Sequence, residues 1–487
     1  MPRSETPLPE SSVALSPGAT APAAAPSIVW LRDDLRLADN PALRAGIDRA
    51  GAKGTGGAGV IVLYLLDEVS PGIRPLGAAS RWWLHGSLAA LAADLEKRGA
   101  RLLLRRGAAE TELPRLVSES GADAVFWNRR YGASREVDAR LTSALREAGI
   151  TVESFAANLL VEPWTVTTAE GNPYRVFTPF WRAAQERPIR ELVATPRELP
   201  SPTGTALADL TSDELHDWDL LPTRPDWAGG LRDAWTPGEA SAYARLEHFV
   251  TGPLADYHRR DEPAVAATSR LSPHLRFGEL SPVQLWHRVH AELTPAARRN
   301  APKFLSELGW REFNWNILFH SPELATTNFR PEFDSFPWDQ PSPEDLAAWQ
   351  QGRTGIPLVD AGMRELWTTG VMHNRVRMVA ASLLVKNLLI DWRVGEEWFW
   401  DTLVDADEAS NPANWQWVAG SGADAAPYFR VFNPELQAAK FDPDGEYLDR
   451  WVPERLDPEF PEPIVDLAAS RREALAAYEV VKASRFR

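Results

Sequence analysis

Short apolar runs alternate with helical segments along the first third of the chain, and this alternation limits the fold more than any other feature. Two runs rich in β-branched residues, Ser27 to Leu31 and Gly59 to Leu66, are typical of buried parallel strands. Further strands are expected at Arg101 to Leu104, Ala124 to Trp127 and Thr151 to Phe155, and helices at Arg81 to Arg98, Thr111 to Ser120 and Arg135 to Ala148. Strands and helices in alternation over residues 27–157 predict a doubly wound α/β domain with a parallel sheet.

The rest of the chain divides into three segments of different composition. Residues 1–26 are rich in Pro, Ala and Ser and lack the apolar stretch of a signal peptide, so we expect a disordered tail. Residues 158–237 hold many prolines and little periodicity, which predicts a long interdomain linker with short helices. Over residues 238–487 the apolar spacing is helical, with breaks expected at prolines such as Pro282, Pro302 and Pro357. Two domains are therefore predicted, the second mostly α-helical.

Composition excludes several classes of protein. The chain has no cysteine, which rules out disulfides, thiolate metal sites, iron–sulfur clusters and cysteine nucleophiles. No apolar run approaches the roughly 18 to 20 residues of a transmembrane helix, so we expect no membrane partner. A net charge of −15 argues against a nucleic-acid partner unless basic residues gather locally. Residues 270–303 do hold six basic residues against two acidic ones, but a solvated helix face gives the same count.

Two segments combine polar and aromatic residues in a way that suits a ligand. Residues 268–272 (TSRLS) precede Pro273 and a helical pattern, so hydroxyl and backbone N–H groups gather at a helix start. This arrangement suits a phosphate, although an ordinary N-cap is the simpler reading. Glu307, Trp310, Arg311 and Asn314 share one helix face at spacings of three and four. A mixed face of this kind suggests a site, and a partly solvated face with a Glu–Arg pair is the alternative.

Two later segments show weaker signals of the same kind. Asn374, Arg377 and Met378 lie close together on one helical side, where they would grip a ligand or fill an interface. Asp405 and Asp407 resemble a metal loop at first sight, but no glycine-containing loop with further carboxylates follows them. His373 has no second His or Cys at ligand spacing. We therefore expect no metal.

Taken in order, these segments resemble one family. The chain carries TSRLS, ELGWREF, GRTGIPLVDAGMRELW, MHNRVRM, DADEASNPANWQW and GADAAPYFRVFNP in the sequence and approximate spacing of photolyases and cryptochromes, and its VWLRDDLRLADNPAL resembles their opening strand and loop. The resemblance is greatest to bacterial class I cyclobutane pyrimidine dimer photolyases. It implies an N-terminal antenna domain on a doubly wound parallel sheet, a long linker and an all-helical FAD-binding catalytic domain.

The resemblance assigns the cofactor contacts. FAD, active in its fully reduced form, would lie in the helical domain, with Asn411 facing flavin N5 and Arg377 paired with Asp405. Asparagine at the position of Asn411 is typical of photolyases, which favours DNA repair. The residues that match FAD contacts are Tyr257, Thr268, Ser269, Arg270, Leu271, Ser272, Phe304, Arg311, Arg377, Asp405, Ala406, Asp407 and Asn411.

The resemblance also assigns a lesion site, since a dimer has to leave the DNA stack to reach the flavin. Glu307 would help by hydrogen bonding to a carbonyl group of the dimer. Asn374 and Met378 stand where (6-4) photolyases typically place a second histidine, so the expected substrate is the cyclobutane dimer. The residues that match DNA or lesion contacts are Arg260, Glu307, Trp310, Arg311, Asn314, Asn374, Arg375, Met378 and Trp417.

Three tryptophans resemble the chain that carries an electron from the surface to the excited flavin: Trp415, Trp392 and Trp338. The implied reaction is electron transfer from light-excited reduced FAD to the dimer, ring opening, and return of the electron. An antenna chromophore is also implied, 8-hydroxy-5-deazaflavin rather than methenyltetrahydrofolate.

The implied partner is UV-damaged DNA. We further expect a monomer in the bacterial cytosol, associated with the nucleoid when bound to DNA. The alternatives are a photosensory cryptochrome, a (6-4) photolyase and a nucleotide-binding oxidoreductase. The last has no G-x-G-x-x-G after a predicted strand.

Overall fold

The first domain is built on a five-stranded parallel sheet. The computed structural model describes residues 25–52, 59–201, 210–291, 293–340, 342–425 and 429–484, so most of the expected tail, residues 1–24, lies outside it. The strand order is β3-β2-β1-β4-β5, and every pair is parallel. The strands are β1 (Ser27–Leu31), β2 (Val60–Leu66), β3 (Leu102–Arg106), β4 (Ala124–Asn128) and β5 (Thr151–Phe155). All five predicted strands are confirmed.

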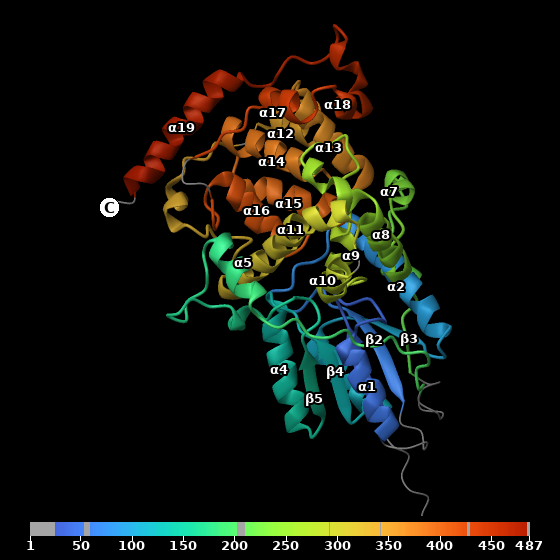
Figure 1. Ribbon diagram of the computed structural model, residues 1–487. Helices are drawn as coiled ribbons and strands as arrows, with labels where there is room; N and C mark the ends of the chain where they lie inside the picture. Colours follow the sequence, from blue (N-terminus) through green and yellow to red (C-terminus); the bar gives the residue numbers. More distant parts are fainter. Residues whose placement is uncertain are drawn as a thin grey trace, which may run out of the picture.

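Helices cover both faces of this sheet because successive strand residues point to opposite sides. Val29 and Leu31 of β1 pack in one hydrophobic cluster with α1 (Pro41–Ala52) and α2 (Ala78–Glu96). Ile28 and Trp30 pack on the other side with α3 (Ala109–Ser120) and α4 (Ser134–Glu147). Figure 1 shows this layered domain at the lower end of the molecule. The prediction of a doubly wound domain is confirmed, with α1 an element for which no range was predicted.

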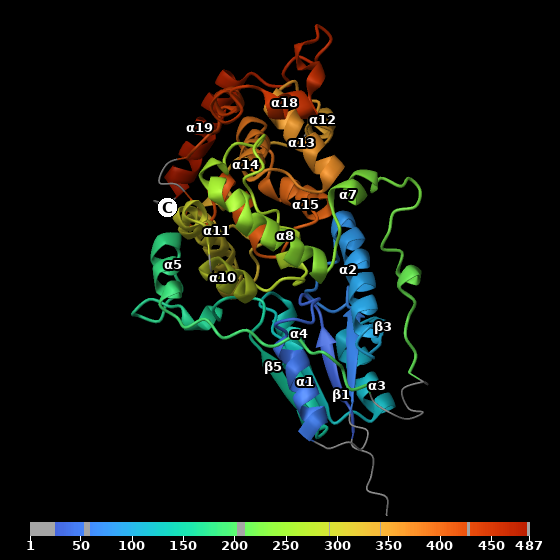
Figure 2. The ribbon, with the colours of Figure 1, turned by 45° about the vertical axis from the view of Figure 1, so that its right-hand side comes forward.

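The linker follows the surface of the α/β domain before it enters the second domain. It contains η1 (Pro163–Thr165), α5 (Phe177–Gln185), η2 (Leu215–Trp218) and α7 (Gly229–Ala234). Trp218 packs in the core of the first domain, with its ring centroid 6.1 Å from that of Tyr64. Figure 2 shows the green chain running along the outside of the sheet domain up to α7. The expectation of short helices in a long connection agrees with these elements.

The second domain is helical. Proline occupies the first turn of many of its helices, where its missing N–H is no loss. The predicted break at Pro302 is wrong, because α11 continues through it and buries Ala301 and Phe304 on either side. The elements are α8 (Glu239–Thr251), η3 (Pro253–Arg259), α9 (Ser272–Arg276), α10 (Pro282–His290), α11 (Pro295–His320), η4 (Pro331–Ser335), α12 (Pro343–Gln350), α13 (Pro357–Thr369), α14 (Asn374–Ser382), η5 (Leu383–Asn387), α15 (Trp392–Thr402), α16 (Ser410–Ala419), α17 (Pro434–Phe441), α18 (Glu446–Trp451), η6 (Pro453–Leu456) and α19 (Leu467–Ser484).

The two domains are joined by a close seam between α2 and α15. The Ala78 N–H donates to Asp401 (2.8 Å), and the Ser80 hydroxyl donates to the Leu403 carbonyl (3.3 Å). A Cβ on Gly77 would come within 2.0 Å of the Trp400 carbonyl oxygen, so the backbones touch at this point. Figure 2 shows α2 rising from the sheet domain to lie beside the helical domain. The seam fixes the position of α15, which contributes to the site described below.

A buried carboxyl group attaches the linker to the helical domain. Glu312 of α11 is 2% exposed and accepts hydrogen bonds from the backbone N–H groups of Leu160 (2.7 Å) and Val161 (3.3 Å). Arg311 donates to its other oxygen (3.3 Å). Burial nevertheless outweighs these contacts and raises the pKa of Glu312 from 4.5 to about 7.

This raised pKa predicts a specific dependence of stability on pH. The folded chain holds the Glu312 proton more tightly than the unfolded chain, so the free energy of unfolding falls as pH rises from 4.5 to about 7. The change contributed by Glu312 is on the order of 3 kcal/mol. Urea unfolding across this range should show a flatter profile for Glu312→Gln than for the unchanged protein. An equal slope in both proteins would contradict the assignment.

Candidate functional site

One large cavity lies among the helices of the second domain. Its volume of about 490 Å³ falls within the roughly 300–1,000 Å³ of cofactor and ligand pockets. Residues from η3, α9, α10, α11, α14, α15 and α16 line it, together with the segment before α9 and the turn between α15 and α16. Segments up to 161 residues apart in sequence, from Tyr257 to Val418, therefore meet around a single space.

The cavity brings together most of the residues predicted from the sequence. Those expected to contact a cofactor and found in its lining are Tyr257, Ser269, Leu271, Ser272, Phe304, Arg311, Arg377, Asp405, Ala406, Asp407 and Asn411. Those expected to contact a lesion and found there are Glu307, Trp310, Arg311, Asn314, Asn374, Met378 and Trp417. Two sets predicted separately thus surround the same space.

Arg270 and Thr268 are absent from the lining. The Arg270 backbone has a φ of +51°, and its guanidinium carbon lies 4.4 Å from the centre of the Trp235 ring. Its neighbours Ser269 and Leu271 do line the cavity. The TSRLS segment therefore offers the cavity its serine hydroxyls and a leucine, while the arginine side chain packs elsewhere.

An ion pair marks one part of the cavity wall. Arg377 Nη2 lies 3.1 and 3.0 Å from the two carboxylate oxygens of Asp405, whose side chain is only 5% exposed. The Ser272 hydroxyl donates to the same carboxylate (2.7 Å), and Arg377 Nε donates to the Met372 carbonyl (2.7 Å). The four groups tie α9, α14 and the turn before α16 together, which makes this wall rigid.

The turn before α16 presents two further polar residues. Asp407 accepts from the backbone N–H groups of Ala409 (2.8 Å) and Ser410 (2.5 Å), so it caps the start of α16. Asn411, one turn later, is 8% exposed and lines the cavity. Its side-chain amide donates to the carboxylate (2.8 Å) and the backbone carbonyl (3.0 Å) of Glu396 on α15.

The rim of the cavity combines aromatic and polar side chains. Trp310 is stacked on Phe177 of α5, with ring centroids 4.0 Å apart and planes 9° from parallel. Glu307 lies 2.7 Å from Lys303 and 3.6 Å from Arg260. An aromatic surface beside hydrogen-bonding groups suits a planar, polar-edged ligand such as a nucleobase.

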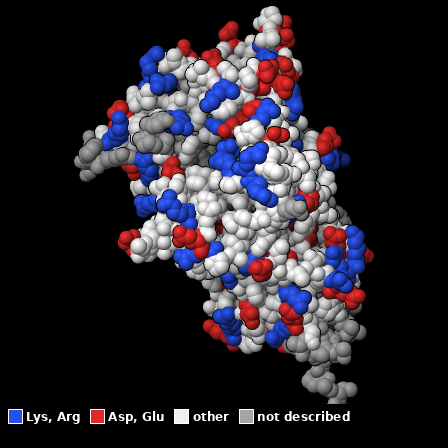
Figure 3. Space-filling model, viewed as in Figure 1, with Lys and Arg blue, Asp and Glu red and all other residues white. Residues whose placement is uncertain are grey.

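Two of the three arginines expected to contact DNA or the lesion, Arg260 and Arg375, are absent from the lining. Arg260 is placed over Tyr257, with its guanidinium carbon 5.6 Å from the ring centre, and it also faces Glu307. Arg375 pairs with Asp261 (3.0 Å) and stacks over Phe441 (4.3 Å). Figure 3 shows Lys and Arg side chains gathered near the middle of the visible face of the helical domain. An acidic chain needs such a local cluster if it is to bind a phosphate backbone.

The three tryptophans of the expected electron path share one hydrophobic cluster. Trp415 lines the cavity and packs edge-on against Phe399 (4.9 Å between centroids). Trp392 is fully buried and donates its indole N–H to Asn328 (2.9 Å). Trp338 is partly buried at the edge of the cluster, 4.3 Å from Phe336. Their order of exposure runs from the cavity lining through a buried residue to a partly exposed one, and the electron path itself stays a prediction.

Some lining residues were not predicted. Arg276 is the most consequential: its Nε donates to the Ala406 carbonyl (2.7 Å) and its Nη1 pairs with Asp33 of the first domain (2.8 Å). Asn414 and Ala381 follow predicted residues by three positions, so helical spacing could have indicated them. The unpredicted lining residues are Leu275, Arg276, Leu285, Leu308, Ala381, Phe399, Leu403, Ser410, Asn414 and Val418.

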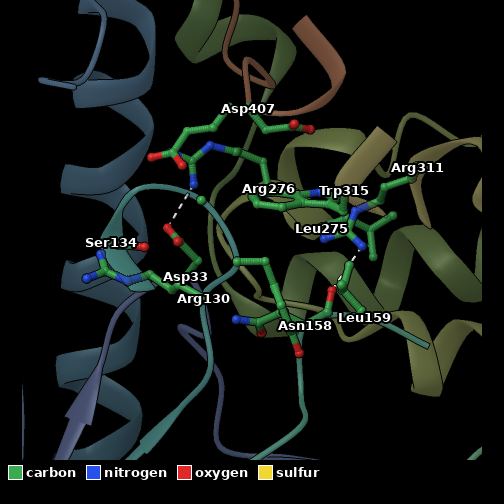
Figure 4. A pocket seen from close by; sticks show the side chains of 13 residues that line it. Asp33, Arg130, Ser134, Asn158, Leu159, Leu275, Arg276, Arg311, Trp315 and Asp407 are labelled. Atoms are coloured by element: carbon green, nitrogen blue, oxygen red, sulfur yellow. Dashed lines mark hydrogen bonds and ion pairs between the residues drawn. The ribbon is translucent and has the colours of Figure 1, made fainter. Parts of the chain in front are cut away.

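A much smaller cavity lies where the strand order of the sheet reverses, between β1 and β4. Ligands of doubly wound domains bind at this point. Here the volume is about 30 Å³, room for one or two water molecules, and Asp33, Arg130 and Arg276 surround it (Figure 4). A tricyclic deazaflavin does not fit between these side chains as they stand, so the antenna expectation gains no support from this crevice.

Fold and cavity together define a class of protein. A sheet domain is docked on a helical domain with a large cavity that has a charged wall, an aromatic rim and tryptophans behind it. Such a site suits an extended aromatic cofactor that meets a second, planar ligand at the rim. In the part of the chain that the structure describes, no helix is long and apolar enough to cross a bilayer, and no cluster of His, Asp or Glu is arranged to hold a metal.

Comparisons with known proteins identify the family to which the chain belongs. Residues 27–202 match the DNA photolyase domain model, and residues 304–457 match the FAD binding domain of DNA photolyase. The chain is 49% identical to a deoxyribodipyrimidine photo-lyase of Agrobacterium fabrum over 94% of its own length and 98% of the relative's. It is 38% identical to cryptochrome-1 of Arabidopsis thaliana, over 88% of this chain and 63% of that one.

A comparison with solved structures leads to the same family. A bacterial class III photolyase from Agrobacterium tumefaciens superposes with a TM-score of 0.88 at 47% identity, covering 96% of this chain and all of that one. The chain belongs to the photolyase/cryptochrome family, and its helical domain is an FAD-binding domain of the photolyase type.

Proposed function

We propose that the protein repairs DNA by using light and reduced FAD to split cyclobutane pyrimidine dimers. The observation that carries this proposal is the shared cavity: residues expected to hold a flavin and residues expected to hold a lesion line the same space. Relatives named deoxyribodipyrimidine photo-lyases cover almost the whole chain, which supports DNA repair as the general activity.

The residues present suit FAD. The cavity is large enough for an extended cofactor, its lining offers hydroxyls at Ser269 and Ser272, and the Arg377–Asp405 pair and Asn411 lie in the same lining. When bound and reduced, FAD would supply the electron that opens the dimer and take it back afterwards. The protein's own part is to hold the flavin, tune the groups around it and exclude water.

The rim residues would bind the dimer. Trp310 offers a flat face already fixed against Phe177, so little side-chain entropy is lost when a base stacks on it. Glu307 and Asn374 provide hydrogen-bonding groups at the same mouth, and Met378 adds an adaptable apolar surface. No general acid or nucleophile is required by this arrangement.

Two other functions of the family are weighed against this one. Asn411, together with the Glu307 and Trp310 pair, favours repair over the signalling role of a cryptochrome. Asn374 and Met378 favour the cyclobutane dimer over the (6-4) lesion. The expected relationship to class I stays a prediction, and the solved relative at 47% identity is described as class III.

The remaining expectations concern partners and surroundings. UV-damaged DNA is the proposed partner, bound by a monomer in the cytosol. Deazaflavin as antenna stays a prediction that requires the side chains around the 30 Å³ crevice to move apart. Adding deazaflavin to the purified protein and following energy transfer to the flavin would test it.

The decisive experiment uses DNA with a defined lesion. Reduced, FAD-loaded protein is incubated with an oligonucleotide that carries one cyclobutane dimer, in blue light and in the dark, and loss of the dimer is followed. Repair in light alone is the expected result. Absence of repair would overturn the proposal, and repair of a (6-4) lesion alone would overturn the choice of substrate.

Replacing Trp310 by Ala is expected to weaken binding of dimer-containing DNA by about 1–3 kcal/mol, the usual contribution of one aromatic stacking partner. FAD content should stay unchanged, since the loss is at the rim. A binding titration and the flavin absorbance measure the two quantities. Trp367→Ala, which removes an exposed tryptophan outside the cavity lining, is the control and should bind as the unchanged protein does. Equal binding by both variants would remove Trp310 from the lesion site.

A further inference from the structure

We propose that Arg74 of the sheet domain and Glu396 of α15 are positioning residues for Asn411, and that docking of the sheet domain thereby stabilises the reduced flavin. This inference rests on the proposed function only in placing a flavin beside Asn411. Its support lies in hydrogen bonds that join the two domains through one buried carboxylate.

The orientation of the Asn411 amide is determined by its partners. One side-chain atom lies 3.0 Å from the backbone carbonyl oxygen and 2.8 Å from a carboxylate oxygen of Glu396. Both partners only accept hydrogen bonds when the carboxylate is ionised, so this atom has to be the NH₂ group. Both amide hydrogens are then used, and Asn411 has only its carbonyl oxygen left for a ligand in the cavity.

The carboxylate of Glu396 is bound by Arg74 of the sheet domain. Its side chain is 3% exposed, and both carboxylate oxygens accept from Arg74, at 2.8 and 3.0 Å. The Arg74 guanidinium stacks over Trp400 of α15, 4.2 Å from the ring centre, and Trp400 donates to the Pro75 carbonyl (2.9 Å). A bidentate, stacked arginine fixes both the charge and the angle of the carboxylate.

The orientation of the Asn411 amide matters because the reduced and oxidised forms of flavin differ at N5. Reduced flavin carries a hydrogen on N5, whereas oxidised flavin has a lone pair there. An amide that offers only an oxygen can accept from the reduced form and repels the oxidised one. The hydrogen bonds that run from Arg74 through Glu396 to Asn411 therefore favour the reduced form of the cofactor, which repair requires.

Replacing Arg74 would remove the cation that holds the Glu396 carboxylate in place. Glu396 would remain as a buried carboxylate without its cation, and its side chain would turn away from Asn411 toward water. Asn411 could then rotate its amide and present either end to the flavin. The preference for reduced flavin should shrink although no residue in contact with the flavin has changed.

The test compares Arg74→Gln and Glu396→Leu with the unchanged protein, all loaded with FAD. We expect the reduced flavin of both variants to reoxidise in air about tenfold faster, the effect that loss of one charge-assisted hydrogen bond allows. The flavin midpoint potential should fall in parallel. Reoxidation is followed by absorbance, and the potential by titration with redox dyes.

A matched control distinguishes loss of Asn411 positioning from a general weakening of the contact between the two domains. Arg135 also joins the domains, donating to the Phe319 carbonyl (2.7 Å), and its side chain is 30% exposed, as is that of Arg74. Arg135→Gln should leave reoxidation and potential unchanged. If it changes them as much as Arg74→Gln does, general docking is responsible and the positioning role is overturned.

A second comparison asks whether the effect passes through Asn411. In an Asn411→Leu background, Arg74→Gln should add nothing, because the group it positions is gone. Independent, additive effects would overturn the proposal. The outcome is distinguishable from failure of the proposed function, since reoxidation and potential are measured on bound FAD whether or not the protein repairs DNA.

Discussion

Arg377→Met is expected to release most of the FAD and to lower the free energy of unfolding by about 3 kcal/mol. Arg377 is the cation that accompanies Asp405, whose side chain is 5% exposed, and Met would leave that carboxylate buried with only the Ser272 hydroxyl as a partner. The value lies at the lower end for buried pairs because the Arg377 side chain is 26% exposed. Flavin absorbance after gel filtration and urea unfolding measure the two effects.

Arg364→Met is the matched control for this change. The Arg364 side chain is 27% exposed and pairs with Glu454 (2.5 Å), but the Glu454 side chain is 40% exposed and can return to water. This variant should keep its FAD and lose no more than about 1 kcal/mol. Full FAD content in Arg377→Met would show that the Arg377–Asp405 pair does not hold the cofactor.

The second large effect concerns the electron path. Trp392→Phe is expected to lose most of its light-driven flavin reduction, because Trp392 is the fully buried member of the path between Trp415 at the cavity and Trp338 at the edge of the cluster. A phenyl ring is far harder to oxidise than an indole. Photoreduction in the presence of an external reductant measures the loss. Chemically reduced variant should still repair a dimer, since repair does not use this path.

Trp398→Phe provides the comparison on the same helix. Trp398 is stacked on Trp367 with centroids 6.2 Å apart, so it has the chemistry of the other tryptophans without their place in the path. Its replacement should leave photoreduction intact. If Trp392→Phe is reduced by light as fast as Trp398→Phe, electrons reach the flavin by another route.

The strands of the first domain could be predicted well because buried parallel strands have continuous apolar sequences. Ser27–Leu31, which is buried throughout, begins and ends at the predicted residues; Thr151–Phe155 does so too, although this edge strand contains Glu153 and Ser154 and is only partly buried. Pro302 shows where local rules fail. Proline removes one helix hydrogen bond, but burial of the residues around it in a 26-residue helix outweighs the loss.

The site was predictable where it depends on sequence motifs and unpredictable where it depends on packing. Glu307, Trp310 and Asn314 share a helix face, and the structure places all three in the cavity lining. Arg270 lies within a motif, yet its positive φ turns its side chain away from the side of its neighbours. Arg74 and Glu396 are 322 residues apart, and neither shows any local signal of their contact.

The stacking of Trp310 on Phe177 determines where domains of two such proteins could be joined in a chimaera. Phe177 belongs to the linker helix α5, and Glu312 of the helical domain binds the linker backbone at Leu160 and Val161. The first part of the linker, through α5, thus packs as part of the FAD-binding domain, whereas Trp218 in its later part packs in the core of the first domain. A chimaera that exchanges the antenna module for a relative's would therefore have to keep residues 158–185 with the helical domain and take the segment around Trp218 from the incoming module, together with the residues that dock Arg74 against α15.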